Sequence, residues 1–315
     1  MDTMAPASHS DSRNREASQV ADAELESWLA EIAAAPRAAP SVTNLRAKRT
    51  RPLGPEIAMV DDHFVSSGDA HPVSVRSYRH DGVLGVPTCV YVHGGGFVFG
   101  DLDSHDRACR RLAVLGGINV IAVDYRRAPE NPAPAAIDDV RTVLTATRTA
   151  IGAHAPLGLA GDSAGALIAL LATDAPRAEV DRVLLVNPNA DLTLSMPSVK
   201  TKGTGWGLDA QDLEWFVSQW APTPELRESR ALNPLLQLPP ATPMTTVITS
   251  EHDPLRDEGL ALAEHLRDAG RLTKHRHLDG MVHGVINLDA VSPSARAWGD
   301  QFLTEFAREL IDARR

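Results

Sequence analysis

From residue 89 onward, short apolar runs of strand length alternate with longer segments of helical spacing. Apolar runs of this length are typical of strands buried on both faces of a sheet. The expected strands are 89–92, 119–123, 157–160, 183–186, 245–249 and 273–278, and the expected helices are 104–115, 135–149, 164–172, 256–269 and 294–313. Repeated strand–helix units predict an α/β fold with a mostly parallel twisted sheet and helices on both faces. Ligands in such folds bind beyond the carboxyl ends of the strands, so a site is expected at that edge.

The segments before and within this alternation differ in character. Residues 1–18 are polar and lack apolar periodicity, which predicts disorder. Residues 190–240 are rich in turn-forming residues and interrupt the strand–helix rhythm. The elements expected in these parts are a helix at 20–35, an antiparallel pair of strands at 57–65 and 72–78, and a helix at 210–220.

The composition argues against several classes of partner. The formal net charge is −10 and the basic residues are scattered, so neither nucleic acid nor an anionic membrane is expected to bind. No apolar run reaches transmembrane length, and residues 1–18 lack the pattern of a secretory signal. Cys89 and Cys109 are the only cysteines, so a disulfide framework is not expected. We therefore expect a cytoplasmic protein without stable membrane association.

The pentapeptide Gly161-Asp162-Ser163-Ala164-Gly165 lies between an expected strand and an expected helix. A serine hydroxyl is a poor nucleophile unless a sharp turn exposes it beside a base. Glycines on either side of such a turn leave room where a Cβ would collide with the neighbouring strand or helix. An ordinary strand-to-helix turn is the alternative interpretation, and the motifs elsewhere in the chain favour a nucleophile.

Residues 93–97 read His-Gly-Gly-Gly-Phe and follow the expected strand at 89–92. Ester cleavage creates an oxyanion, and successive glycines let backbone N–H donors approach it closely. Together with the N–H of Ala164, this loop would complete an oxyanion hole. A phosphate-binding loop is the alternative, but neither Gly-Lys-Ser/Thr nor Gly-x-Gly-x-x-Gly follows.

An acid and a base for Ser163 are expected after later strands. Asp253 follows the strand at 245–249, and His283 follows the strand at 273–278. The order Ser163, Asp253, His283 is the chain order of a hydrolase triad on an α/β sheet. His283 would take the serine proton, and Asp253 would fix its tautomer. Glu251 and Asp257 are alternative candidates for the acid, and the distance of each carboxylate from His283 must decide between them and Asp253.

Most of the other histidines have no partner motif, so we interpret them as surface or structural residues: His63, His71, His80, His105, His154 and His265. His275 and His277 alternate along one strand, and with Asp279 they raise the alternative of a metal site. Strand alternation often brings such pairs together, so no metal is expected.

These motifs resemble those of the hormone-sensitive-lipase-like family of α/β-hydrolases, which includes the bacterial type IV esterases. The resemblance runs from about Thr88 to the C-terminus and rests on residues 93–97, 161–165, 253–259 and 283–284 and on Asp-Tyr-Arg-Arg-Ala-Pro-Glu at 124–130. It implies the α/β-hydrolase fold and assigns the oxyanion-hole amides to Gly95, Gly96 and Ala164. The segment 124–130 is structural in the family, which implies that its charges pair locally.

The resemblance also implies a helical cap over the site. It places an N-terminal tail and cap helices at 1–50, and a catalytic domain at 51–315 with a cap insertion at 190–230. This insertion holds several aromatic residues, although only 4% of the chain is aromatic. We expect some of these side chains to pack on the sheet as core and others to line an apolar pocket. The residues expected to line the substrate pocket are Phe97, Phe99, Trp206, Trp215, Phe216 and Val285.

Three positions depart from the family pattern. Arg127 stands where Leu is usual, Leu167 follows Ala166 where Gly-Asn is common, and Val285 replaces a Phe after His-Gly. None of these belongs to the expected triad. Arg127 and Val285 are expected at the pocket edge, so the substrate preference of relatives is not carried over.

The sequence predicts a serine carboxylesterase that cleaves short- to medium-chain acyl esters through an acyl-enzyme, without cofactor or metal. Activity is expected to fall as the pH drops through the imidazole pKa, about 6.5 when unperturbed. A non-catalytic small-molecule binder, an amidase, lactonase or deacetylase, and a lyase or dehydratase that uses the oxyanion hole are the alternatives. The expected partner is a small ester, and the resemblance adds a homodimer.

Overall fold

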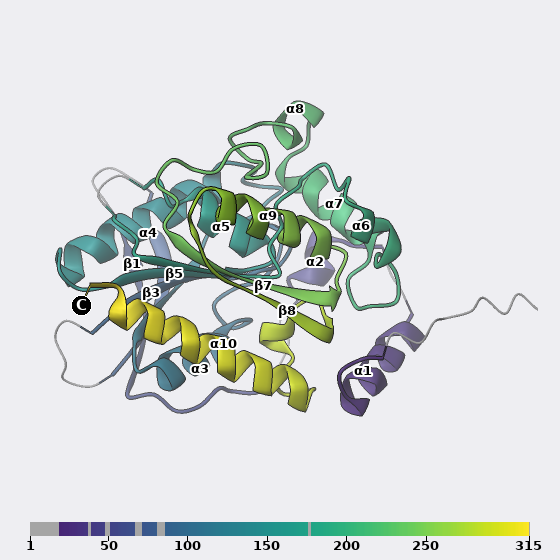
Figure 1. Ribbon diagram of the computed structural model, residues 1–315, viewed down its shortest axis with the longest axis horizontal. Coiled ribbons are helices and arrows are strands. Elements are labelled where there is room, and N and C mark those ends of the chain that lie inside the picture. The colour runs from purple at the N-terminus through teal and green to yellow at the C-terminus, as the bar shows by residue number, and fades with distance from the viewer. Residues whose placement is uncertain are drawn as a thin grey trace, which may run out of the picture.

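The computed structural model describes residues 19–36, 39–47, 51–66, 71–80, 86–175 and 178–314. Within these residues an eight-stranded sheet forms the centre of the molecule (Figure 1). The strands in spatial order are β1 (Met59–Val65), β2 (Val73–Arg79), β4 (Asn119–Asp124), β3 (Thr88–Val92), β5 (Leu157–Asp162), β6 (Arg182–Val186), β7 (Met244–His252) and β8 (Leu272–Val282). The predicted disorder of residues 1–18 lies outside the described residues.

The direction of the strands agrees with the prediction of a mostly parallel sheet. β2 runs antiparallel to both β1 and β4, and the strands from β4 to β8 run parallel. β7 and β8 are longer than predicted, so that β7 ends directly before Asp253 and β8 directly before His283. The longer strands therefore place both residues at the carboxyl edge of the sheet.

Helices cover both faces of the sheet, as predicted. In chain order they are α1 (Ala23–Ala34), α2 (Val42–Leu45), α3 (Asp106–Gly116), α4 (Ala135–Ile151), α5 (Ala164–Leu171), α6 (Pro197–Thr201), α7 (Ala210–Trp220), α8 (Pro224–Arg227), α9 (Arg256–Asp268) and α10 (Pro293–Ile311). Helices α3 and α10 pack together on one face, and α4, α5 and α9 lie on the other (Figure 1). The turn η1 (Val285–Asn287) follows β8, and η2 (Asp312–Arg314) follows α10.

Strand β3 shows why this arrangement forms two cores. Successive side chains of a strand point to opposite faces, and all five residues of β3 are buried. Cys89 and Tyr91 belong to the core under α3 and α10, whereas Val90 and Val92 belong to the core under α4 and α5. A strand buried on both faces is apolar at almost every position, and this explains why the sequence of β3 lacks alternation; its one polar residue, Thr88, donates its hydroxyl to the Val86 carbonyl.

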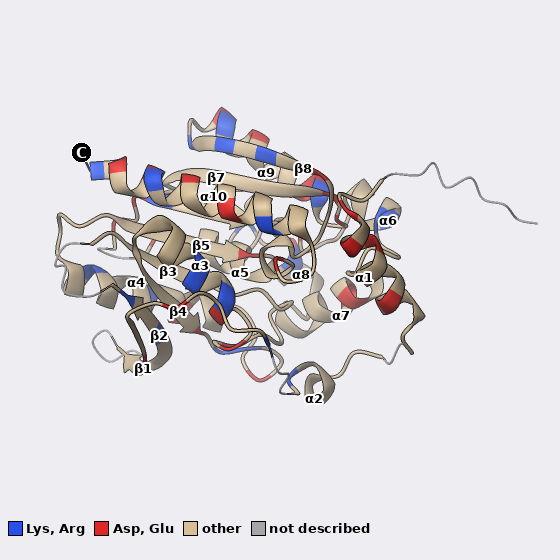
Figure 2. Ribbon diagram, turned by 90° about the horizontal axis from the view of Figure 1, so that it is seen from below, with Lys and Arg blue, Asp and Glu red and all other residues tan. Residues whose placement is uncertain are grey.

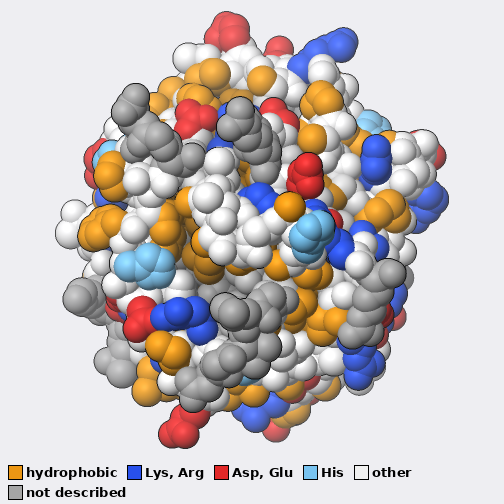
Figure 3. All heavy atoms as spheres, turned by 90° about the vertical axis from the view of Figure 1, so that its left-hand side faces the viewer, with side chains coloured by type: hydrophobic (Ala, Val, Ile, Leu, Met, Phe, Trp, Pro, Cys, Tyr) orange, Lys and Arg blue, Asp and Glu red, His pale blue; other side chains and the backbone are white. Residues whose placement is uncertain are grey.

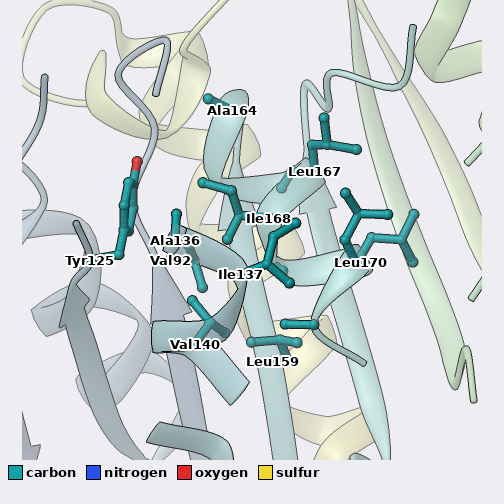
Figure 4. Close-up of a cluster of buried hydrophobic side chains, with 14 of the residues drawn as sticks. Val92, Tyr125, Ala136, Ile137, Val140, Leu159, Ala164, Leu167, Ile168 and Leu170 are labelled. Atoms are coloured by element: carbon teal, nitrogen blue, oxygen red, sulfur yellow. The ribbon is translucent and has the colours of Figure 1, made fainter. Parts of the chain in front are cut away.

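Figure 4 shows the core under α4 and α5 close to the sheet. Ile137 of α4 and Ile168 of α5 lie over Val92 of β3 and Leu159 of β5, and all four are buried. Every residue of α5 is buried, so this helix is apolar all round rather than amphipathic. The helix that begins after Ser163 is therefore fixed by packing along its whole length.

The N-terminal segment lies along the carboxyl edge of the sheet and is tied to distant parts of the chain. Ala21 donates its backbone N–H to the Gly280 carbonyl, 3.0 Å away. The Asp22 carboxylate accepts from Leu25 N at 2.8 Å, which caps α1. Its second oxygen accepts from Ser292 Oγ at 2.5 Å and from Ser294 N at 2.9 Å at the start of α10. One carboxylate thus serves the first turns of two helices that are far apart in sequence.

Helix α1 also contacts the insertion that carries α6, α7 and α8. A Cβ placed on Gly207, in the loop before α7, would lie 3.3 Å from the Trp28 ring and 3.5 Å from Ile32. Figure 2 shows α1 beside α7 on this side of the molecule. The N-terminal helix and the insertion therefore meet, as a shared cap requires; the domain boundaries remain a prediction.

The described surface carries mixed charges and few large exposed apolar side chains. Both acidic and basic residues occur along α9 and α10 (Figure 2), and hydrophobic groups are interrupted by charged ones on the face in Figure 3. Among the described helices, none combines the length and apolar character needed to cross a bilayer. Cys89 and Cys109 are both buried and unpaired.

Candidate active site

Ser163 occupies the sharp turn between β5 and α5 that the pentapeptide predicted. Its backbone angles, φ of 55° and ψ of −125°, lie in a region that residues other than glycine rarely adopt. A Cβ on Gly161 would lie 2.5 Å from the Gly165 carbonyl oxygen, and a Cβ on Gly165 would collide with the carbonyl oxygens of Val92 and His93. The turn is therefore possible only because both flanking residues are glycines.

Ser163, His283 and Asp253 lie within hydrogen-bonding distance in series. His283 Nε2 is 2.9 Å from Ser163 Oγ, and His283 Nδ1 is 2.9 Å from Asp253 Oδ2. Asp253 is 1% exposed, and its other oxygen accepts from Leu255 N at 2.8 Å. With Nδ1–H donating to Asp253, Nε2 is left free to accept the serine proton.

The surroundings of His283 set its pKa. Burial lowers the pKa, because an imidazolium ion loses its water shell. The charge of Asp253 and the hydrogen bond to it raise the pKa, and the charge of Asp162 adds to this effect. The sum holds the pKa of His283 above its ordinary value of 6.5. The neutral imidazole that a base requires is consequently lost at a higher pH than for an isolated histidine.

The two rival carboxylates have other partners. Glu251 Oε2 accepts from Gly280 N at 2.7 Å, and this bond lowers the pKa of Glu251 despite partial burial. Asp257 accepts from Ser198 N at 2.8 Å and from Arg256 at 2.8 Å. Glu251 therefore binds strand β8 and Asp257 binds helix α6, and the carboxylate that bonds to His283 is Asp253.

The glycine loop after β3 lies beside the serine with its N–H groups available. The φ angles of Gly95 and Gly96 are 127° and 56°, conformations that favour glycine. Within the described chain, the N–H groups of Gly95, Gly96 and Ala164 donate to no other group. They are thus free to donate to a negatively charged oxygen next to Ser163 Oγ.

Three interactions hold this loop from behind. His93 Nδ1–H donates to the Gly94 carbonyl at 2.7 Å, and burial lowers the pKa of His93 to about 3, so the ring is neutral. The Tyr125 hydroxyl donates to the His93 carbonyl at 2.9 Å. Arg46, just after α2, donates to the Val98 carbonyl at 2.8 Å. The N-terminal segment is thereby linked to the end of the loop.

The segment 124–130 pairs its charges only partly within itself. Arg127 forms an ion pair with Asp124 at 3.5 Å and also donates to the Gly100 carbonyl at the cavity edge. Arg126 pairs with Asp139 of α4, and Glu130 accepts from Arg46 at 2.8 Å. The expectation of local pairing is therefore wrong for Arg126 and Glu130, because their partners lie on α4 and on the N-terminal segment.

A cavity of about 170 Å³ opens over Ser163. Its lining includes the candidate oxyanion residues Gly95 and Gly96, together with His283. Of the predicted pocket residues, Phe97, Phe99 and Phe216 line it. The side that faces the expected cap is formed by α7 and the loop before it, through Leu208, Leu213, Phe216 and Val217.

The other three predicted pocket residues lie elsewhere. Trp206 stacks on the buried His252 ring, with centroids 4.0 Å apart. Trp215 contacts Phe216 edge-on at 5.6 Å but packs toward the core. Val285 is fully buried in the core under α3 and α10. These side chains do not line the cavity, because helix and turn geometry turns them toward neighbouring elements.

His105 lines the cavity, although the sequence offered it only a surface or structural role. His105 Nε2 lies 3.2 Å from the Asp162 carboxylate and 2.9 Å from Asn287 Nδ2. Burial raises the pKa of Asp162, but the charge and hydrogen bond of His105 and the Tyr91 hydroxyl hold it below its ordinary value. No spacing rule relates residues 105 and 162, so only the neighbouring strands of the sheet bring them together.

The histidines that suggested a metal have another partner. His275 Nε2 and His277 Nδ1 each lie 3.0 Å from Thr249 Oγ1. The Asp279 side chain is 92% exposed and 3.9 Å from His277. No group of three His, Cys, Asp or Glu residues in the described part of the chain is arranged to hold a metal ion.

Comparison with known proteins gives a consistent picture. The family described as α/β hydrolase fold matches residues 89–287. An ethyl acetate hydrolase of Pseudomonas putida is 34% identical over 253 residues, covering 75% of this chain and 78% of that protein. The carboxylesterase NlhH of Mycobacterium tuberculosis is 35% identical over 269 residues, covering 80% of this chain and 83% of that protein.

A solved structure extends the similarity to three dimensions. The ester hydrolase EH1AB1 from the metagenome of Lake Arreo, in complex with a derivative of bipyridine phosphonate, superposes with a TM-score of 0.77. It is 31% identical in sequence, and the match covers 91% of this chain and 98% of that chain. The similarity therefore extends over most of the chain.

Proposed function

The chain belongs to the hormone-sensitive-lipase-like family of α/β hydrolases and is a carboxylic ester hydrolase, and we propose that Ser163, His283 and Asp253 carry out its reaction through an acyl-enzyme. The observation that supports this most is the unbroken series of two 2.9 Å contacts from Ser163 Oγ through the imidazole to Asp253. A nucleophile, a base and an orienting acid in this series are what acyl transfer requires.

In the first step Ser163 Oγ attacks the ester carbonyl carbon while its proton passes to His283 Nε2. The carbonyl oxygen becomes an oxyanion, which accepts hydrogen bonds from the N–H groups of Gly95, Gly96 and Ala164. The imidazolium then gives its proton to the leaving alkoxide, and the carbon–oxygen bond of the ester breaks. The alcohol departs and the acyl group remains on the serine.

In the second step water replaces the alcohol. His283 takes a proton from the water as its oxygen attacks the acyl carbon, and the same amides hold the second oxyanion. Return of the proton to Ser163 Oγ releases the carboxylic acid and restores the serine. Asp253 stays ionised throughout, keeping Nδ1–H oriented and stabilising each imidazolium.

The size of the cavity favours short- to medium-chain acyl groups. Its volume of about 170 Å³ is well below the roughly 300–1,000 Å³ of pockets for drug-sized ligands. Phe97, Phe99 and Phe216 would contact the hydrocarbon part of the substrate. We also propose that the N-terminal helices and α6–α8 act as the cap, since α7 forms one side of this cavity.

Fluorophosphonate labelling tests the proposal. The reagent should attach to one serine, Ser163, and peptide mass mapping identifies the position. Ser163→Ala should abolish labelling and lower p-nitrophenyl butyrate hydrolysis, on the order of a millionfold when a triad acts as a unit. Retention of a tenth of the activity would reject the serine mechanism.

A panel of p-nitrophenyl esters of increasing acyl length measures the chain preference. Activity should be highest for short to medium chains. Ser163 that fails to react with the label in a folded protein would favour the non-catalytic binder instead. The matching amide and lactone substrates separate an esterase from an amidase or lactonase, because the same triad serves each.

A cytoplasmic location, a homodimer and the absence of a nucleic-acid partner are further proposals. The buried free thiols of Cys89 and Cys109 fit a reducing compartment. The net charge of −10 supports the third proposal, and the homodimer rests on the family resemblance. Cell fractionation and size-exclusion chromatography with light scattering test the first two.

A further inference from the structure

A short segment of the chain brings one cation to the cavity over Ser163. Arg51 lines this cavity and also an adjoining polar groove of about 630 Å³. The next residue is Pro52, which restricts Arg51 to extended backbone conformations. The Leu53 carbonyl accepts from Arg107 Nη1 at 2.7 Å, and a Cβ on Gly54 would lie 2.9 Å from the Arg110 side chain. The segment is thus held closely against α3.

The carboxylates of the adjoining groove are already engaged with other arginines. Arg76 bonds to Asp62 at 2.6 Å, to Asp103 at 2.9 Å and to Asp106 at 3.4 Å. Asp106 also receives Arg110 at 2.7 Å. These three carboxylates line the groove beside Arg51 without pairing to it.

Arg51 itself has no hydrogen bond or ion pair to the rest of the described chain. The carboxylate that lines the Ser163 cavity, Asp162, accepts from Tyr91, from Gly94 N and from His105 instead. A guanidinium with five donors and a permanent charge therefore stands at the edge of a mostly apolar cavity. In a chain of net charge −10, a guanidinium without a paired carboxylate at this place is available to bind an anionic group that arrives with the substrate.

We propose that Arg51 determines specificity for esters that carry a negatively charged group, such as a carboxylate, in their acyl or alcohol part. The inference rests on the proposed esterase function and names its substrate class. The ester carbonyl reaches Ser163, and the charged group accepts hydrogen bonds from the guanidinium at the cavity edge. Because the Arg51 side chain is exposed, water and salt weaken the attraction, and a preference of roughly tenfold is expected.

Matched substrates isolate the charge. One pair, 4-acetoxybenzoate and 4-acetoxybenzamide, differs in charge on the alcohol side; the other, mono-4-nitrophenyl adipate and 4-nitrophenyl adipamate, differs on the acyl side. In at least one pair, Arg51→Ala should lower the anion-to-amide ratio of kcat/KM roughly tenfold, mainly through KM. Arg51→Glu should lower the ratio further, and high salt should lower it in the unmodified protein only.

Arg230→Ala is the matched control, because it removes the same charge from an exposed position that does not line the cavity. It should leave the ratio unchanged. The same anion-to-amide ratio in both pairs for Arg51→Ala and the unmodified protein would overturn the inference. Failure of the proposed function has a different signature, namely no hydrolysis of any of the four esters and no fluorophosphonate label on Ser163.

Discussion

The two sides of the cavity over Ser163 are fixed by different means. On the sheet side, the backbone around the serine turn is packed so closely that a Cβ at Gly161 or Gly165 would collide with it. On the cap side, α7 approaches the glycine loop through side chains, and a Cβ on Gly96 would lie 2.5 Å from the Phe216 ring. Backbone contacts tolerate almost no change, whereas side chains can repack. Changes on the sheet side should therefore affect rate, and changes on the cap side should affect which substrate is accepted.

After Ser163→Ala, the largest effect is expected from Asp253→Asn. The amide would favour the wrong tautomer of His283, and the loss of kcat should be about 10⁴-fold, as in other serine triads. Steady-state kinetics with p-nitrophenyl butyrate measure it. Glu251→Gln and Asp257→Asn are the controls, since Glu251 bonds to β8, Asp257 bonds to α6 and neither bonds to His283. A loss of kcat in either control equal to that in Asp253→Asn would contradict the proposal that Asp253 is the carboxylate that orients His283.

Gly95→Ala should come next. The new Cβ would collide with the Phe99 carbonyl oxygen at a φ of 127°, so the loop must shift and its N–H groups move. Misplacing an oxyanion donor should lower kcat roughly 10²- to 10³-fold. Gly117→Ala, where φ is 60° but the space is open, is the matched control and should reduce thermal stability without this loss. A Gly95→Ala enzyme with normal kcat would mean that this loop does not hold the oxyanion.

The pH profile should show an intermediate effect. Since Asp253 holds the pKa of His283 above 6.5, kcat/KM should fall about tenfold per pH unit below an inflection that lies above that value. The base is active when neutral, so activity is lost as the pH falls. In Asp253→Asn the residual activity should have its inflection at lower pH, because the charge that favours imidazolium is gone. Identical inflections in the two proteins would contradict this coupling.

The smallest effect is expected on the cap side. Phe216→Ala removes a ring from the cavity wall, so longer acyl chains gain room, and the ratio of hexanoate to acetate hydrolysis should rise roughly tenfold. Trp215→Ala is the control, because this neighbour packs toward the core and does not line the cavity. A loss of kcat in Phe216→Ala as large as that in Gly95→Ala would show that α7 affects the reaction rate and not only the choice of substrate.

The sheet side was also the more predictable from sequence. Glycines at positions 161 and 165 are required by the backbone itself, so the motif carries the local structure with it. The pairing of Ser163, Asp253 and His283 followed from their order in the chain, since each comes after a strand that was expected in a parallel sheet. Strand lengths were underestimated for β7 and β8, because polar residues near their ends hide the extended backbone.

The side of the cavity formed by α7 was less predictable. An aromatic residue in a helix can face the core, the solvent or a cavity, and apolar spacing does not distinguish the last from the first. Trp206 faces His252, and Val285 enters the core through the turn η1. His105 was missed for a related reason, because its partner Asp162 is distant in sequence and is reached only through the folded sheet.

The shared capping by Asp22 has a consequence for how the protein can be shortened. Removal of residues through Asp22 would leave Ser294 N and Ser292 Oγ without their acceptor at the beginning of α10. The first turns of α1 and α10 should then unfold together, because both depend on the Asp22 carboxylate. Proteolytic trimming near the start would thus loosen the final helix, although some 270 residues of intact sequence separate them.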